Sequence, residues 1–224
     1  MPPHSPASAA DVTLVLASAS PARLATLRAA GIDPAVIVSD IDEDLVVADS
    51  LDRYGRLGPA DIVLLLARAK CEEVASRTAL SAVVIGCDSL LEIGGQVHGR
   101  PADAAEAVAR WRWMRGRSGV LHTGHWVRDE RDVDDGGGGG TLGATASTTV
   151  HFAEISDEEV ERYVATGEPL RVAGAFTIDG LGGAFVTAIK GDHHTVVGLS
   201  LPLLRELLGE LGIDWFDVAS ARGH

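Results

Sequence analysis

The chain has 224 residues, a formal net charge of −13 and 46% hydrophobic residues, a composition that fits one globular domain and excludes a disordered chain. A pI near 4.9 argues against bulk binding to nucleic acid, which requires a basic surface. No apolar run approaches the roughly 18 residues of a membrane span. Because there are two cysteines, Cys71 and Cys87, and no signal-peptide pattern before Val12, we expect a cytoplasmic protein.

The first half of the chain alternates strands and helices. Residues 1–11 are predicted to be a disordered tail, and the apolar run Val12–Ala17 has the length of a buried strand. Ser20 and Pro21 are favoured N-cap and first-turn residues, so we expect a helix from there to Gly31. The elements that follow in order are a strand at 35–38, a helix from Pro59 to about Ser76 and a strand at 82–87.

The second half continues this mixture and adds a glycine-rich tip. The elements expected there are a hairpin of 90–93 with 96–97, a helix from Pro101 to about Arg115, strands at 120–127 and 144–151, a helix from Ser156 to Gly167 and a last helix from Pro202. Residues 129–143, which include five consecutive glycines, are predicted to be a mobile hairpin tip. We therefore expect a single α/β domain over 12–216, with a mixed central sheet flanked by helices, and a tail at 217–224.

The loop Ala17–Ser20 carries the signal of an anion site. It is small and rich in hydroxyl groups, and it leads into a helix N-terminus, where free N–H groups and the helix dipole attract anions. Arg23 falls in the first turn, where a cation opposes the dipole by about 0.3–1 kcal/mol, whereas hydrogen bonds to a charged partner contribute about 1.5–3 kcal/mol. Arg23 therefore either contacts a bound phosphate or points to solvent or an acid, and spacing alone leaves both interpretations open.

Two further side chains are unusual for their positions. Lys70 lies within the apolar stripe of the helix after Pro59, so it either snorkels outward or faces a polar cleft. Asp88 follows the strand 82–87, and we expect its carboxylate at the strand's carboxyl end, where open α/β sheets bind ligands. Asp88 is then either a metal ligand or proton acceptor, or a turn residue that ends the strand.

Other carboxylates and histidines give weaker signals. Glu43, in the acidic run 40–44, could supply a second carboxylate to a metal, although such a run is by default a solvated loop. His193 and His194 suggest a metal or acid–base site, but neighbours on an extended strand face opposite ways, so at most one is expected to reach it. Together, two hydroxyl groups, two cations and two carboxylates could bind a phosphate chain with a divalent metal. These residues are Ser18, Ser20, Arg23, Lys70, Glu43 and Asp88.

Short motifs follow one another in a characteristic order from about Val12 to about Leu211. They are Leu16–Arg23, Asp42-Glu43, Ala67–Lys70, Ile85–Ser89, Gly99–Pro101, His122–Gly124, Tyr163–Pro169, Ala173–Gly180 and Val196–Pro202. In these motifs the chain resembles the Maf family of nucleoside triphosphate pyrophosphatases, also called septum formation proteins. The resemblance implies an inosine triphosphatase-like fold with a strongly bent mixed sheet. It also implies hydrolysis of a nucleoside triphosphate to the monophosphate and pyrophosphate with a divalent metal, Mg²⁺ or Mn²⁺.

The resemblance also implies roles for single residues. Asp88 and Lys70 match the catalytic positions, with Asp88 as the proton acceptor, and Glu43 matches an acidic residue that would share the metal with Asp88. The implied substrate-binding residues are Ser18, Ser20, Arg23, Ser89, Arg100 and Asp179. Arg100 stands where the family usually has lysine, which keeps the charge but replaces a point charge by a planar fork.

The preferred base does not follow from the resemblance, and two other functions stay open. Ala22, Ser89 and Asp179 match neither the subgroup that acts on dTTP and UTP nor the one that acts on 7-methyl-GTP. One rival is a nucleotide-binding regulator of cell division that does not hydrolyse its ligand. The other is a phosphomonoesterase with Asp88 as nucleophile, but that class carries a second aspartate where this chain has Leu90. Family analogy allows a homodimer, without nucleic acid or membrane as a partner.

Overall fold

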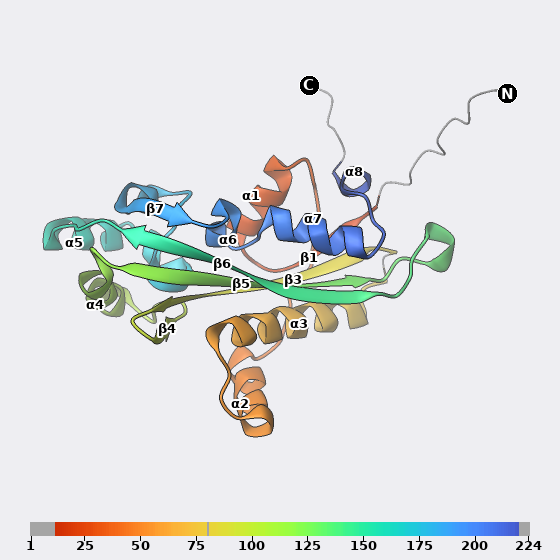
Figure 1. Cartoon of the computed structure of the whole chain (residues 1–224), viewed down its shortest axis with the longest axis horizontal. Coiled ribbons are helices and arrows are strands. Elements are labelled where there is room, and N and C mark those ends of the chain that lie inside the picture. The colour runs from red at the N-terminus through yellow and green to blue at the C-terminus, as the bar shows by residue number, and fades with distance from the viewer. Residues whose placement is uncertain (1–11, 80, 220–224) are drawn as a thin grey trace.

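The computed structural model describes residues 12–79 and 81–219 and contains a seven-stranded sheet with helices packed on it (Figure 1). The strands are β1 (Leu14–Ala17), β2 (Ala35–Val36), β3 (Val83–Ile93), β4 (Gln96–His98), β5 (Ser118–Asp129), β6 (Thr141–Phe152) and β7 (Val186–Lys190). The helices are α1 (Pro21–Ala29), α2 (Glu43–Tyr54), α3 (Pro59–Arg77), α4 (Ala104–Met114), α5 (Asp157–Ala165), α6 (His193–Val197), α7 (Leu201–Glu210) and α8 (Trp215–Val218).

The sheet is mixed, as the sequence predicted. Its strand order is β2-β1-β3-β5-β6-β7, and β4 pairs with β3 outside this path. β1 runs parallel to β2 and β3, whereas the neighbours from β3 to β7 pair antiparallel. Helices cover both faces of the sheet, which confirms the predicted mixed α/β class with a sheet flanked by helices.

Local capping signals explain where the predicted helices begin. The Ser20 side chain accepts a hydrogen bond from the Arg23 N–H, with Pro21 in the first turn of α1. Both bonds of the capping box between Ser156 and Glu159 are present at the start of α5. These caps satisfy N–H groups that a helix leaves unpaired, so the sequence predicted these starts correctly.

Helix α3 packs unusually close to the sheet. A Cβ atom added at Gly86 of β3 would lie 2.2 Å from the carbonyl oxygen of Ala67, and one added at Gly124 of β5 would lie 2.2 Å from that of Val63. Two glycines therefore let the backbone of α3 approach both strands. This contact turns the apolar stripe of α3 towards the sheet and carries Lys70 with it.

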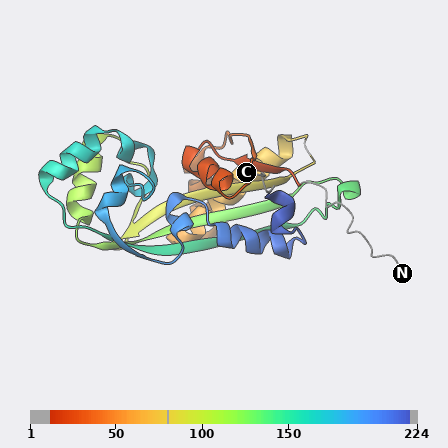
Figure 2. The ribbon, with the colours of Figure 1, turned by 90° about the horizontal axis from the view of Figure 1, so that it is seen from above.

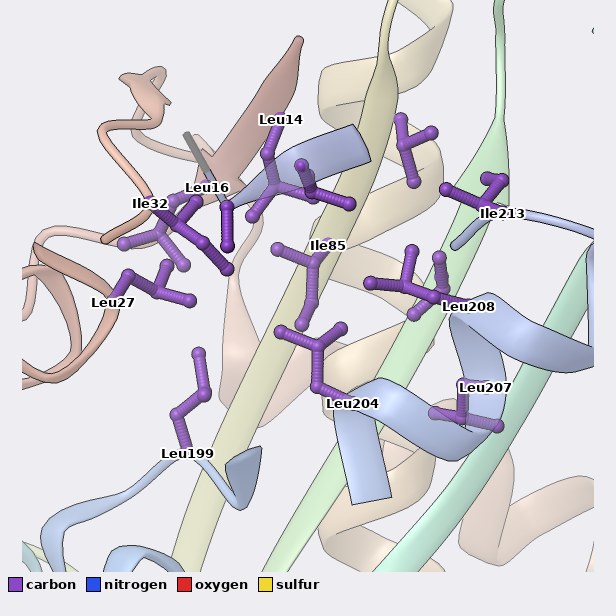
Figure 3. Close-up of a cluster of buried hydrophobic side chains, with 14 of the residues drawn as sticks. Leu14, Leu16, Leu27, Ile32, Ile85, Leu199, Leu204, Leu207, Leu208 and Ile213 are labelled. Carbon is purple, nitrogen blue, oxygen red and sulfur yellow. The ribbon is translucent and has the colours of Figure 1, made fainter. Parts of the chain in front are cut away.

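Three hydrophobic clusters hold the layers together. Figure 3 shows the first cluster, in which Leu14, Leu16 and Ile85 of the sheet pack against Leu27 of α1 and Leu204 and Leu208 of α7. The second cluster joins the far halves of β3, β5 and β6 to α4 and α5, which lie together at one end of the molecule (Figure 2). The third cluster packs α3 on β1 and β3. Each cluster buries a different part of the sheet.

Three local predictions were wrong. The strand predicted to end at Cys87 continues to Ile93, because β3 pairs with β5 without a break from Val83 to Glu92. The acidic run after Asp40 is not only a loop, since Asp42 caps α2 and Glu43 begins it. His193 and His194 do not lie on a strand, because the Asp192 side chain caps the short helix α6 at that point.

The ends and the tip differ in part from the prediction. The boundary at 216 falls inside α8, and Val218 and Ala219 belong to the first core cluster, so the packed region extends further. The tip 129–143 connects β5 to β6 as expected, and Asp129 organises it by accepting hydrogen bonds from Arg131 and the Gly138 N–H. The predicted tail at 1–11 lies outside the described residues. No described helix is both long and apolar enough to span a membrane.

Candidate active site

The site lies where one edge of β3 changes partners. β1 pairs with β3 as far as the pair Ala17–Gly86, and β4 begins to pair at Leu91. Among the described residues, 87–90 have no strand partner on this side, although β5 continues on the other. The loop after β1 and the N-terminus of α1 lie beside this gap, so the predicted anion site meets β3 there.

A buried ion pair forms the centre of the site. Lys70 Nζ lies 2.6 Å from Asp88 Oδ1 and 2.8 Å from Glu43 Oε1. Lys70 is 9% exposed and Asp88 7%, whereas the Glu43 side chain at the start of α2 is 44% exposed. The structure therefore excludes the interpretation of Lys70 as a lysine that points to solvent. Lys70 is on the face of α3 that packs on the sheet, and its partner Asp88 is on β3 in that sheet.

Arg23 is the second buried cation, and it does not point to solvent. Its Nε donates to the Gly198 carbonyl at 2.7 Å, and one terminal nitrogen donates to the Cys87 carbonyl at 2.8 Å and to Ser18 Oγ at 3.0 Å. The other terminal nitrogen donates to Ser89 Oγ at 3.1 Å. These bonds connect α1, β3 and the loop after α6 around one guanidinium group.

The two cations approach the same short segment of β3 from opposite faces of the sheet. Side chains alternate along a strand, so Asp88 faces α3 while Ser89 faces α1 and α6. Lys70 therefore binds the Asp88 carboxylate from one side, and Arg23 binds the flanking residues Cys87 and Ser89 from the other. Sequence reasoning expected both cations at one site, and in the structure both contact residues 87–89 at the unpaired edge of β3, one from each face of the sheet.

Burial and these charges together set the acidity of Asp88. Removal from water raises the pKa of its carboxyl group, and the cations Lys70 and Arg23 oppose this effect in part, so the pKa stays above the ordinary value of 3.8. A carboxylate with a raised pKa binds a proton more tightly than an exposed aspartate does. Asp88 is therefore suited to accept a proton from water.

The other predicted site residues divide into two groups. Ser18 and Ser89 are hydrogen-bonded to Arg23, and Ser20 caps α1 and donates its N–H to Ser18 Oγ at 3.2 Å. Arg100 and Asp179 are exposed and make no hydrogen bond or ion pair with these groups within the described part of the chain. Asp179 instead lines an open cavity of about 310 Å³ against α1, together with His193 and His194.

The two carboxylates on Lys70 are the residues that could hold a divalent metal. No group of three or more histidine, cysteine or acidic side chains suited to a metal occurs among the described residues. Mg²⁺ is usually bound by one or two carboxylates and completes its shell with water and substrate phosphates. The Glu43 and Asp88 pair therefore fits a metal that arrives with a triphosphate, and it does not resemble an all-protein metal cage.

Sequence reasoning missed His125, which is fully buried beside the site. Its Nε2 accepts the N–H of Ser200 at 2.8 Å, so the proton of the neutral ring is on Nδ1, which donates to the Thr123 carbonyl at 3.0 Å. Burial, and after it the positive charge of Arg23, lowers the pKa of His125 from the ordinary 6.5 to about 4. The motif His122–Gly124 ends one residue before His125, so no sequence motif marked His125 as a residue near the site.

The lowered pKa of His125 predicts loss of stability in acid. Between pH 6.5 and 4 the unfolded chain binds a proton at this ring that the folded protein does not, so folding stability falls as pH falls through this window. The expected contribution is about 3 kcal/mol, from a pKa difference of between two and three units. Urea unfolding of wild type and His125→Gln at pH 7 and pH 4.5 checks this, because the variant should lose less stability on acidification. Equal losses would contradict the prediction.

Comparison with known proteins agrees with the motifs at this site. The family model "Maf-like protein" matches residues 13–211. The chain belongs to this family. It is 57% identical over 204 residues to a protein of Salinispora tropica named nucleoside triphosphate pyrophosphatase, covering 89% of this chain and 84% of that one. Proteins with the same name from Streptomyces coelicolor and Nostoc punctiforme are 53% and 47% identical, with 89% and 91% of this chain covered and 90% and 95% of theirs.

Among solved structures, the chain is similar to a crystal structure of a nucleoside-triphosphatase, dITP/XTP pyrophosphatase, from Mycobacterium abscessus. The two are 11% identical, the TM-score is 0.36, and the match covers 89% of this chain and 94% of the other.

Proposed function

We propose that this Maf-like protein hydrolyses a nucleoside triphosphate to the monophosphate and pyrophosphate. Three relatives at 47–57% identity are named for this activity. The observation that carries the proposal is the buried ion pair of Lys70 and Asp88, which Glu43 joins from the surface, near the N-terminus of α1 and Arg23. It combines a proton acceptor with positive charge, which hydrolysis of a phosphoanhydride requires.

In the proposed reaction a water attacks the α-phosphorus while Asp88 accepts its proton. Lys70 orients the Asp88 carboxylate through the 2.6 Å contact, so that one oxygen is held while the other faces the water. The N-terminus of α1 and Arg23 supply positive potential for the phosphate oxygens. Arg100, exposed after β4, is proposed as a further phosphate contact.

Glu43 and Asp88 are proposed as the metal-binding residues, with Mg²⁺ or Mn²⁺ as the ion. When bound, a divalent ion neutralises charge on the phosphates of the substrate. Without a metal, the ammonium group of Lys70 neutralises the negative charge of Glu43 and Asp88, because it contacts both carboxylates.

A pyrophosphate-release assay over ATP, GTP, CTP, UTP and the deoxynucleotides, with magnesium, manganese or cobalt, tests the proposal. We expect one pyrophosphate and one nucleoside monophosphate for each triphosphate consumed, and loss of turnover when EDTA is added. Binding without release of pyrophosphate would support a regulator that only senses nucleotides. Release of orthophosphate from monophosphates would instead support a phosphomonoesterase, and either result would overturn the proposal.

A further inference from the structure

Two hydroxyl groups and one carbonyl group, from half-buried Ser89 and buried Thr123 and Thr195, form a chain of hydrogen bonds behind Arg23. Arg23 donates to Ser89 Oγ at 3.1 Å, and Ser89 Oγ lies 2.9 Å from Thr123 Oγ1. Thr123 Oγ1 in turn donates to the carbonyl of Thr195 in α6, also at 2.9 Å. The chain thus leads from the α1 cation across β3 and β5 to α6, and Thr123 and Thr195 in it are 0% and 1% exposed.

The direction of each bond follows from the number of protons available. A carbonyl can only accept, so the single hydroxyl proton of Thr123 goes to Thr195. Thr123 Oγ1 can then only accept from Ser89, which uses the single hydroxyl proton of Ser89. Ser89 therefore has no proton left for a ligand, and it presents a lone pair to Arg23.

The hydrogen bonds of Arg23 can be counted in the same way. Its guanidinium group has five N–H bonds. Four of them are directed at the Gly198 and Cys87 carbonyls and at the hydroxyls of Ser18 and Ser89. One N–H, on the nitrogen that Ser89 holds, has no acceptor within the described residues. The plane of the guanidinium group fixes the direction of that N–H, and the bond to Ser89 is one of the four that hold this plane and the one on the same nitrogen.

The geometry points to Thr123 as a positioning residue for the phosphate site. By accepting a hydrogen bond from Ser89, Thr123 keeps the Ser89 hydroxyl oriented as an acceptor for Arg23, which helps to hold the guanidinium group with its remaining N–H available to a phosphate oxygen. This inference rests on the proposed function. Ser89 then acts on the phosphate end of every nucleotide through Arg23 and makes no donor contact with the base.

Gly198 supports this assignment, because it leaves the guanidinium group little room to turn. Its φ is +116°, and a Cβ atom there would lie 3.3 Å from Arg23 Nε and 3.5 Å from Ser89 Oγ. The loop after α6 is thus packed against both members of the chain. Without the Ser89 acceptor, the terminal nitrogen of Arg23 that carries the remaining N–H has no acceptor among the described residues.

Thr123→Val tests the inference, because valine keeps the shape of threonine and removes its hydroxyl group. We expect KM for triphosphates to rise about five- to tenfold, the size that follows from losing one hydrogen bond, with kcat changed less than twofold. Thr123→Ser keeps the hydroxyl and should restore KM to within twofold of wild type. A Thr123→Val enzyme with wild-type KM would overturn the inference.

Thr148→Val is the matched control. Thr148 is also fully buried, on the neighbouring strand β6, and its hydroxyl donates to the Asp192 carbonyl at 2.9 Å beside α6 without touching Ser89 or Arg23. Both valine variants should lower Tm by similar amounts, because each leaves one carbonyl without its donor. Only Thr123→Val should raise KM, and an equal rise in both variants would show a purely structural role.

Ser89→Ala provides a second test that does not depend on the folding of the Thr123 variants. It should raise KM by the same factor for ATP, GTP, CTP and UTP, because Ser89 acts through Arg23 on the phosphates. Factors that differ among the bases by more than about threefold would overturn the inference and make Ser89 a base-reading residue. Wild-type protein assayed in parallel separates this inference from the proposed function. If the proposed function is wrong, wild type itself releases no pyrophosphate, whereas an error in the inference alone changes only the result for the variants.

Discussion

Asp88→Asn should lower kcat about 10²- to 10⁴-fold, the range lost when a general base is removed. Asparagine has nearly the same shape and keeps an amide oxygen for the Lys70 ammonium group at 2.6 Å, so the ion-pair geometry should be disturbed little. Nucleotide affinity measured in EDTA, without the divalent metal that Asp88 is proposed to bind, should be retained or improved, because a negative charge next to the polyphosphate is lost. Pyrophosphate release and calorimetric titration with a nucleoside triphosphate measure the two quantities separately.

Asp129→Asn is the control for this experiment. Asp129 is also buried, at 2% exposed, but it lies at the hairpin tip and accepts hydrogen bonds from Arg131 and the Gly138 N–H. These bonds lower the pKa of Asp129 against the effect of burial, so its charge stabilises the fold at neutral pH. The control should lose thermal stability and keep its kcat. Turnover close to wild type in Asp88→Asn would remove Asp88 from the mechanism.

Gly86→Ala should damage stability and activity together. The added methyl group would lie 2.2 Å from the Ala67 carbonyl oxygen and 2.8 Å from the Cys71 nitrogen, and both are backbone atoms that cannot rotate away. Helix α3 must therefore move off the sheet, at a cost of about 1–3 kcal/mol or more in the free energy of unfolding. The same movement separates Lys70 from Asp88, so kcat/KM should fall at least tenfold. Urea unfolding and steady-state kinetics check the two effects.

Gly209→Ala is the control for Gly86→Ala, because the same substitution is expected to raise stability at this position. Gly209 is exposed in α7, and an added Cβ atom there meets nothing within 4 Å. Alanine favours the helix by about 0.5–1 kcal/mol over glycine, so this variant should be more stable and fully active. If Gly86→Ala were as stable as wild type, the close contact between α3 and β3 would not describe the protein in solution.

Sequence patterns predicted the parts of the site that are local. The position of Lys70 in an apolar stripe indicated that it was buried or snorkelling, and its burial against Asp88 decided between them. Ser20 and Pro21 marked the start of α1, since caps are made by residues three positions apart or fewer. The motifs gave the family correctly, and the match over residues 13–211 confirms it.

The sequence by itself determined the starts of α1, α3 and α5, the mixed class and the family, because caps, periodicity and motifs are each read from residues near one another in the chain. Tertiary structure alone decided which side of β3 each cation approaches and which hydroxyl bonds to which. Ser89 and Thr123 are 34 residues apart, and Thr123 and Thr195 are 72 apart, so their contacts exist only once β3, β5 and α6 are assembled. Strand register makes that decision, since a shift by one residue would turn Ser89 and Thr123 to opposite faces of the sheet.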